Sequence, residues 1–377
     1  MSQHRLQHLL PPVAVQKVSA LVVLLTLCVA APLQAQEKPN SGGSWKFAVS
    51  GDSRNCGDIV MPAIAQGALK DGAAFYWHLG DFRRITNVDE DYLRIHPYAS
   101  MDDYLTGAWP DFIQHQLKPF GDLPIFLAIG NHELAKPMTR PQYVEQFSEW
   151  LDKPAIRQQR LTDNPNDHQV KTYYHWIDRG IDFISMDNGS ADMFDDTQMA
   201  WVRMVLANAA KDPSVRTVVV GMHSTFPEGL STGHSMNDTP TQHATGRQVY
   251  AQLVEFRRGT GKHVYVLGSH SHFVLNNVYE TSCNGKDRVL PGWIIGGAGA
   301  VRYRLPKNHT VATVAKTDVY GYLLATVAPD DTITFEFKQV NERDVPASVV
   351  EQFSRKLVDW CFAENKSDYT PAGPVCP

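Results

Sequence analysis

Short apolar runs alternate with helical patterns along most of the chain. Strands are predicted at the apolar runs Lys46–Ser50, Phe75–Leu79, Pro124–Ile129, Ile181–Met186, Thr217–Gly221, Val264–Leu267 and Trp293–Ile295. A run such as TVVVG is almost entirely apolar, which is typical of a strand buried on both faces of a sheet. Helices are predicted between these runs, at Ile59–Lys70, Asp103–Leu117, Gln142–Leu151, Thr197–Ala210 and Gly246–Arg258. The alternation predicts an α/β fold with much parallel sheet.

The C-terminal part has a different pattern. Tyr320–Val327 and Thr332–Val340 flank the turn Pro-Asp-Asp and predict an antiparallel pair of strands. Two segments are longer than structural connections need: Phe82–Gln116, rich in aromatic residues and histidine, and Ser224–Thr245, which carries His234. Long loops beside a scaffold are often lids or substrate walls. Plain surface packing is the alternative for both.

The N-terminus has the pattern of a secretory signal peptide, residues 1–35. A basic start precedes a short apolar run, and small residues allow cleavage after Ala35. The run is shorter than the about 20 apolar residues of a membrane span, although an uncleaved anchor is the alternative. A flexible lead-in (36–44), one large domain (45–341) and a C-terminal tail (342–377) follow. The protein is therefore expected in the periplasm or secreted, away from the membrane once cleaved.

Four cysteines remain after the predicted cleavage, which removes Cys28: Cys56, Cys283, Cys361 and Cys376. In an exported protein they suggest up to two disulfides. The short separation of Cys361 and Cys376 favours a bridge that ties down the tail, and Cys56 would then pair with Cys283. Buried or free thiols are the alternative.

The charge balance excludes little. The 377 residues include 35 Lys and Arg against 40 Asp and Glu, a net charge of −5 with neutral histidines. No basic stripe of the kind that holds a polynucleotide is present, so nucleic acid is not expected as a partner. The clusters Arg83-Arg84, Arg257-Arg258 and Arg302/Arg304 are interpreted as solvated loop charges.

Polar signatures follow five of the predicted strands. They are Gly51-Asp52-Ser53-Arg54, Gly80-Asp81, Gly130-Asn131-His132-Glu133, Gly221-Met222-His223-Ser224 and Gly268-Ser269-His270-Ser271-His272. Loops beyond the carboxyl ends of strands in an open α/β sheet converge on one crevice, so these residues can meet there. Their oxygen and nitrogen ligands suit Zn²⁺, Mn²⁺ or iron rather than Ca²⁺, and thiolate ligands are absent from the set.

These signatures, in this order, resemble the calcineurin-like metallophosphoesterase family, which includes purple acid phosphatases, protein phosphatases and cyclic-nucleotide phosphodiesterases. The resemblance runs from about Trp45 to Ala300, and GNHE is its most specific single motif. It implies a four-layer αββα sandwich of two mixed sheets flanked by helices, and makes residues 45–341 the catalytic domain. It also implies two metal ions (Zn, Mn or Fe) that activate a water molecule for in-line attack on phosphorus.

The resemblance assigns a role to each matching residue. Asp81 would bridge both ions, while Asp52 and His272 would bind the first ion. The second ion would be bound by Asn131, His223 and His270. His132 would face the substrate and stabilise or protonate the leaving oxygen. Glu133 is expected to orient a histidine through a hydrogen bond. Gly296-Gly297-Ala298-Gly299 resembles a loop that borders the site in several relatives.

The chain departs from the family pattern at the first metal position. Many members begin with Asp-x-His, whose histidine binds the first ion, but here that residue is Arg54. Purple acid phosphatases instead have a tyrosine three residues after the second Asp, where this chain has Arg84. Arg54 could bind a substrate phosphate through its guanidinium fork or form a structural ion pair. Ser269 replaces the usual glycine before His270.

The leading hypothesis is therefore an exported hydrolase that acts on a small phosphorylated substrate. A phosphomonoester is favoured over a phosphodiester, although a phosphodiesterase or nuclease would use the same metal ions. A catalytically degraded phosphate- or metal-binding protein on this scaffold is a second hypothesis, motivated by the missing first histidine. A metal-dependent amide hydrolase fits histidine-rich sites in general, but not this order of motifs.

Overall fold

The computed structural model describes residues 43–189, 194–237 and 239–373. The predicted signal peptide (1–35), Cys28, Cys376 and most of the predicted lead-in lie outside these ranges. All described residues belong to one unit, Pro39–Pro377. Within them, no helix has the length and apolar character required to cross a lipid bilayer.

The first sheet has five strands in the order β12-β11-β1-β2-β3. They are β1 (Trp45–Ser50), β2 (Ala73–His78), β3 (Ile125–Leu127), β11 (Tyr320–Val327) and β12 (Ile333–Val340). The neighbours β1, β2 and β3 are parallel, whereas β11 runs antiparallel to both β1 and β12. The antiparallel pair predicted in the C-terminal part is thus confirmed, and it extends the parallel strands into a mixed sheet.

The second sheet has seven strands in the order β10-β8-β9-β7-β6-β5-β4. They are β4 (Tyr174–Asp178), β5 (Ile181–Ser185), β6 (Thr217–Gly221), β7 (His263–Gly268), β8 (Val274–Asn276), β9 (Gly292–Ile295) and β10 (Ala315–Lys316). The central strands β5, β6, β7 and β9 are parallel, and antiparallel strands close both edges. All five residues of β6 are buried, as expected for a strand covered on both faces.

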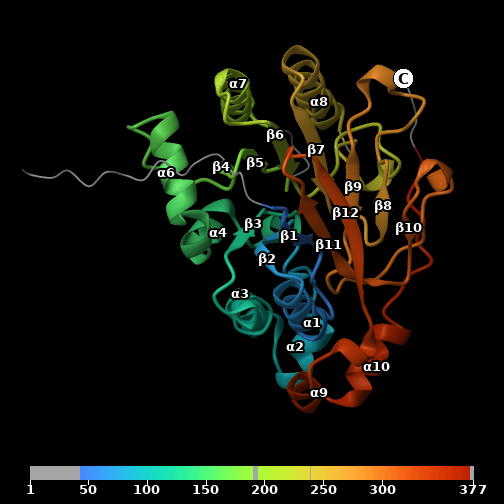
Figure 1. Ribbon diagram of the computed structural model, residues 1–377. Coiled ribbons are helices and arrows are strands. Elements are labelled where there is room, and N and C mark those ends of the chain that lie inside the picture. Colours follow the sequence, from blue (N-terminus) through green and yellow to red (C-terminus); the bar gives the residue numbers. More distant parts are fainter. Residues whose placement is uncertain (1–42, 190–193, 238, 374–377) are drawn as a thin grey trace, which may run out of the picture. The chain divides into compact units, whose positions relative to one another are not determined.

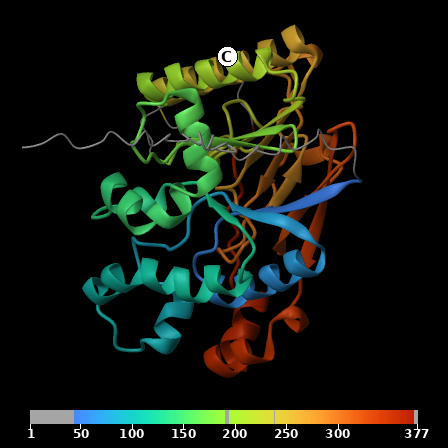
Figure 2. The ribbon, with the colours of Figure 1, turned by 60° about the vertical axis from the view of Figure 1, so that its left-hand side comes forward.

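Helices flank the two sheets (Figure 1). They are α1 (Gly57–Lys70), α2 (Glu90–Ile95), α3 (Met101–Phe112), α4 (Arg140–Gln146), α5 (Ser148–Leu151), α6 (Pro154–Asp163), α7 (Asp196–Lys211), α8 (Pro240–Thr260), α9 (Ala347–Phe353) and α10 (Arg355–Ala363). Helices α9 and α10 lie beside α1 and α2. Helix α1 packs on the first sheet, and α7 and α8 lie side by side over the second (Figure 2).

Aromatic side chains fill the space between the two sheets. Phe183 of β5 lies edge-on to Phe47 and Phe75 of the first sheet, with ring centroids 5.2 Å apart in both pairs. Trp176 of β4 stacks on Phe126 of β3 at 3.8 Å. The sheets therefore pack face to face, and the predicted αββα sandwich of two mixed sheets is confirmed.

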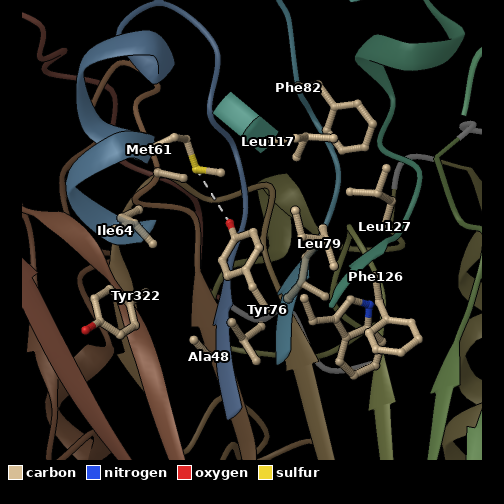
Figure 3. Close-up of a cluster of buried hydrophobic side chains, with 14 of the residues drawn as sticks. Ala48, Met61, Ile64, Tyr76, Leu79, Phe82, Leu117, Phe126, Leu127 and Tyr322 are labelled. Atoms are coloured by element: carbon tan, nitrogen blue, oxygen red, sulfur yellow. Dashed lines mark hydrogen bonds between the residues drawn. The ribbon is translucent and has the colours of Figure 1, made fainter. Parts of the chain in front are cut away.

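The packing of α1 fixes the carboxyl ends of β1 and β2, which lead into the polar loops after these strands. Met61 and Ile64 face Tyr76 on β2, whose hydroxyl donates a hydrogen bond to the Met61 sulfur at 3.6 Å (Figure 3). The same hydroxyl lies 2.6 Å from the Ser50 hydroxyl, at the last residue of β1. The buried cluster thus holds β1 and β2 in register directly before their polar loops.

The disulfide pairing expected from sequence is wrong. Cys56 bonds to Cys361, so neither a Cys56–Cys283 nor a Cys361–Cys376 bridge forms. Cys361 lies on α10, the part of the C-terminal tail that packs against the loop between β1 and α1. The cysteine nearest to Cys361 in the sequence was therefore not its partner in space. Cys283 is also disulfide-bonded.

Two of the arginine clusters interpreted as solvated contain buried side chains. Arg83 is fully buried and forms ion pairs with the Asp58, Asp91 and Asp111 carboxylates. The guanidinium of Arg302 is buried too and donates hydrogen bonds to backbone carbonyls, including that of Cys361. Arg83 neutralises buried carboxylates, and Arg302 donates hydrogen bonds to buried carbonyl oxygens. The interpretation of these two arginines as solvated loop charges is therefore wrong.

Candidate metal centre

The structure brings together all six residues that the sequence predicts as metal ligands. Each follows the carboxyl end of a parallel strand: Asp52 after β1, Asp81 after β2, Asn131 after β3, His223 after β6, and His270 and His272 after β7. Ligand atoms of Asp52, Asp81, His223 and His270 lie within 4.8 Å of one another. Asn131 Oδ1 lies 2.9 Å from His223 Nε2, and His272 Nε2 lies 3.2 Å from Asp52 Oδ1.

Three of these residues have an unusual backbone conformation. Asp52, Asp81 and His270 have φ angles of 59°, 60° and 64°, in the left-handed region that side chains other than glycine seldom adopt. Such conformations cost on the order of 1 kcal/mol each and persist only where the surroundings enforce them. A Cβ on Gly130 would lie 2.4 Å from the Asp81 carboxylate, so the glycine of GNHE allows this approach.

The candidate second metal position comprises Asp81, Asn131, His223 and His270, the residues that the sequence resemblance assigns to it. The Nδ1–H of His223 donates to the Leu79 carbonyl at 2.9 Å, which turns Nε2 toward the centre. There Nε2 meets only atoms with lone pairs: Asn131 Oδ1, His270 Nδ1 at 2.9 Å and Asp81 Oδ1 at 3.3 Å. Burial alone would lower the pKa of His223, but Asp81 raises it to about 9. Such convergence of lone pairs requires a proton or a cation between them.

The candidate first metal position comprises Asp52, Asp81 and His272, the residues that the sequence resemblance assigns to it. His272 Nδ1–H donates to the Val301 carbonyl at 2.6 Å, so its Nε2 also faces inward. A backbone carbonyl that fixes the histidine tautomer is the usual partner of a metal-binding histidine. Asp52 Oδ2 accepts hydrogen bonds from the Ser269 hydroxyl and from the His270 N–H.

The donor set fits a cation. Asp52 Oδ1 and Asp81 Oδ2 are fully buried, yet no described residue donates a hydrogen bond to either oxygen. A buried carboxylate oxygen without a donor is costly unless a cation neutralises it. Carboxylate, amide and imidazole ligands together suit Zn²⁺, Mn²⁺ or iron.

Arg54 and His132 lie at the same centre. An N–H of Arg54 donates to His272 Nε2 at 2.8 Å, and its other terminal nitrogen contacts His132 Nε2 and lies 3.7 Å from Asp81 Oδ2. His132 Nδ1–H is bonded to the Arg84 carbonyl, so that Nε2 points inward. Arg54 is only 8% exposed, which excludes a freely solvated role for it.

Glu133 does not orient a histidine, contrary to the prediction. Its carboxylate accepts hydrogen bonds from the backbone N–H groups of Asp81, Phe82 and Gly130, all at 2.8 Å. A buried carboxylate is better satisfied by three convergent amides than by one ring nitrogen. Glu133 thus ties the loop after β2 to the loop after β3, and so positions Asp81 relative to Asn131.

Three further side chains reach the centre without having been assigned a role from sequence. Ser269 orients Asp52, and its place directly before His270 was the available signal. His234, from the long Ser224–Thr245 segment, lies with its ring 4.7 Å from that of His270. Tyr303 stacks on His272 at 4.0 Å, and its place four residues after the glycine loop Gly296–Gly299 was the available signal. The second long segment therefore does form a wall of the centre.

A cavity of about 360 Å³ opens beside Arg54. Cationic and aromatic side chains line it together with two carboxylates: Arg54, Arg84, Lys366, Tyr303, Trp360, Glu90 and Glu364. Arg84 and Glu90 come from the Phe82–Gln116 segment, of which α2 and the turn Ile113–Leu117 contact α1. A larger cavity of about 660 Å³ lies at the opposite, amino-terminal ends of β2 and β3 and shares no residue with the centre.

Comparisons with known proteins give structural neighbours alone. No protein-family model and no curated protein matches the chain. Similar solved structures include that of PhoD, with 12% identity, a TM-score of 0.49 and coverage of 80% of this chain and 72% of that one. A dimetal phosphatase from Danio rerio has 11% identity, a TM-score of 0.48 and coverage of 78% and 96%. A metallophosphoesterase from Sphaerobacter thermophilus has 13% identity, a TM-score of 0.26 and coverage of 82% and 98%.

Proposed function

We propose that the chain is a metal-dependent phosphoric ester hydrolase of the calcineurin-like metallophosphoesterase type. One observation carries the proposal: six side chains from five strand-end loops converge, and the buried Asp52 Oδ1 and Asp81 Oδ2 among them accept no hydrogen bond from a described residue. Metal ions bound there would withdraw charge from phosphoryl oxygens and make a water molecule a better nucleophile. The family resemblance of the motifs in their order along the chain supports the same activity.

The side chains around the centre have separate tasks in this proposal. Asp81 holds the two metal positions together, since its two oxygens face different sides of the centre. His132 presents Nε2 toward the centre and would stabilise or protonate the leaving oxygen. Arg54 supplies a permanent positive charge beside the phosphoryl group. His234 and Tyr303 would form an aromatic boundary on one side of the centre.

A phosphomonoester is the proposed substrate class. Arg54, Arg84 and Lys366 outnumber the two carboxylates that line the adjoining cavity. A terminal phosphate with two negative charges gains more from such surroundings than a diester with one. The net charge of −5 also argues against a polynucleotide substrate. A phosphodiesterase remains the second candidate because the metal ligands would be the same.

Activity on a panel of phosphoesters tests this proposal. Protein loaded with Mn²⁺ or Zn²⁺ is expected to hydrolyse an aryl phosphate faster than the corresponding bis-aryl diester. Asn131→Ala is expected to lose metal and activity together, because it removes a ligand from the second position. Asn188→Ala is a matched control, since the Asn188 amide donates to the Ser224 carbonyl outside the ligand set. Absence of turnover on every ester by fully metal-loaded protein contradicts the proposal.

We further propose that the protein acts outside the cytoplasm. The signal-like N-terminus and the Cys56–Cys361 disulfide support this, since stable disulfides are typical of oxidising compartments. N-terminal sequencing of protein recovered from the periplasmic or secreted fraction is the test. A mature chain that begins at Gln36 is expected, and recovery of the intact chain from the cytoplasm alone contradicts it.

A further inference from the structure

The Arg54 guanidinium lies on the side of the centre where the first metal ion would bind. Its N–H donates at 2.8 Å to His272 Nε2, the only ring nitrogen with which His272 can bind a metal, because Nδ1–H is already bonded to the Val301 carbonyl. The other terminal nitrogen lies 3.7 Å from Asp81 Oδ2. The guanidinium therefore faces the same lone pairs that define the first metal position.

A metal ion and this guanidinium compete for one nitrogen. His272 Nε2 and Asp52 Oδ1 are 3.2 Å apart, a separation that a single ion with bonds of about 2.0–2.2 Å can bridge. The Nε2 atom has one lone pair, so binding an ion requires the Arg54 N–H to leave. Arg54 is 8% exposed and always charged, and moving it toward the ion would bring two positive charges together.

The second metal position has no such competitor. Among the described residues, no lysine or arginine lies at hydrogen-bond or ion-pair distance from the side chains of Asn131, His223 or His270. His223 Nε2 lies 2.9 Å from both Asn131 Oδ1 and His270 Nδ1 and 3.3 Å from Asp81 Oδ1. The second metal position therefore needs an added cation, whereas the first already has the positive charge of Arg54 beside it.

We infer that Arg54 is the resident cation of the first metal position. The centre then binds one metal ion tightly, through Asp81, Asn131, His223 and His270, and a second ion only by displacing the guanidinium. The inference rests on the proposed metal-dependent function. Displacing the guanidinium breaks a buried charge contact. The second ion is therefore expected to bind on the order of a hundredfold more weakly than the first.

Titration of the metal-stripped full chain with Mn²⁺ tests the inference, with elemental analysis after equilibrium dialysis and the electron paramagnetic resonance spectrum as readouts. Wild-type protein is expected to bind one Mn²⁺ tightly and to give the spectrum of an isolated ion. Arg54→His removes the resident charge and adds a ligand, so two ions should bind with similar affinity and give the spectrum of a coupled pair. Arg54→Lys keeps the charge and should resemble wild type.

Arg84→Ala is the matched control. Its guanidinium is ion-paired with Glu90 at 3.3 Å outside the ligand set, so Mn²⁺ binding should be unchanged. If Arg54→His fails to fold, Arg54→Ala should still tighten the second ion relative to wild type. Two equally tight ions in wild-type protein, or one tight ion in a folded Arg54→His variant, overturn the inference while leaving the proposed hydrolase intact. Failure of every variant to bind Mn²⁺, with no phosphoester turnover, instead removes the proposed function and the inference with it.

Discussion

The Ser269 hydroxyl donates a hydrogen bond to Asp52 Oδ2 across 217 positions of the chain. Asp52 follows β1 in the first sheet and Ser269 follows β7 in the second, so the contact joins the two sheets at the metal centre. It leaves Asp52 Oδ1 directed toward His272 Nε2. The serine that replaces a glycine of the family motif therefore orients a predicted metal ligand.

Ser269→Ala is expected to lower phosphoester turnover at a fixed Mn²⁺ concentration by about tenfold, the lower range for loss of a partner that orients a metal ligand. Asp52 would keep the His270 N–H as its donor, which limits the effect. Ser271→Ala is the control, because that hydroxyl lies 2.6 Å from the Ser231 hydroxyl and does not contact Asp52. Equal turnover in both variants would mean that the Ser269 hydroxyl does not orient the ligand.

His132→Ala is expected to leave the bound metal unchanged while turnover falls by about 10²–10⁴-fold. The loss should be larger for an alkyl phosphate than for a nitrophenyl phosphate, because the poorer leaving group depends more on a proton or hydrogen bond from the imidazole. Metal content and the kcat values of both substrates are the measurements. Loss of metal in this variant would identify His132 as a ligand and contradict its proposed role.

Removal of the Cys56–Cys361 disulfide is expected to destabilise the fold by about 2–5 kcal/mol, since the bond closes a long loop. The two cysteines are 305 positions apart, and the bond ties α10 to the loop that carries Arg54. Urea unfolding of Cys56→Ser/Cys361→Ser against wild type measures the effect. A coincident unfolding midpoint in the two proteins would show that the bond adds no stability.

The stability of the fold should fall at alkaline pH through His175. Its ring is buried and contacts the Asp182 and Asp163 carboxylates at 2.7 and 2.5 Å. Burial would lower the pKa of His175, but these carboxylates raise it to about 9, above the value of 6.5 expected for the unfolded chain. The stabilisation is therefore complete below about pH 6.5 and is lost as the pH rises through about 9.

Urea unfolding of wild type and His175→Gln from pH 6 to pH 10 measures this dependence. The shift in pKa corresponds to about 3 kcal/mol, so the difference in unfolding free energy between the two proteins should shrink by that order across the range. A constant difference at every pH would indicate that His175 is neutral in the folded protein.

Most of the strands, and the convergence of the six candidate ligand residues, could be predicted from sequence because both follow local patterns. The run TVVVG is a strand of five buried residues, and the polar residues that follow β1, β2, β3, β6 and β7 meet because parallel strands direct their carboxyl ends to one edge. Strand β4 was missed, since Tyr174–Asp178 has only two consecutive apolar residues, Trp176 and Ile177, beside a histidine and an aspartate.

Features that depend on contacts between distant segments could not be predicted in this way. The pairing of Cys56 with Cys361 requires knowledge of where α10 packs. Arg83 is buried because the Asp58, Asp91 and Asp111 carboxylates surround it, and nothing local distinguishes it from the exposed Arg258. The place of Tyr303 against His272 similarly follows from tertiary packing alone.

A titration of activity with metal tests most directly whether the protein hydrolyses phosphoesters through metal bound at this centre. Metal-stripped wild-type protein should be inactive on an aryl phosphate, and turnover should rise in proportion to bound Mn²⁺ as the Asp81–Asn131–His223–His270 position fills. Asp81→Ala should gain neither metal nor activity over the same range. Equal turnover in the stripped and loaded proteins, or none in the loaded protein, would contradict hydrolysis through metal at this centre.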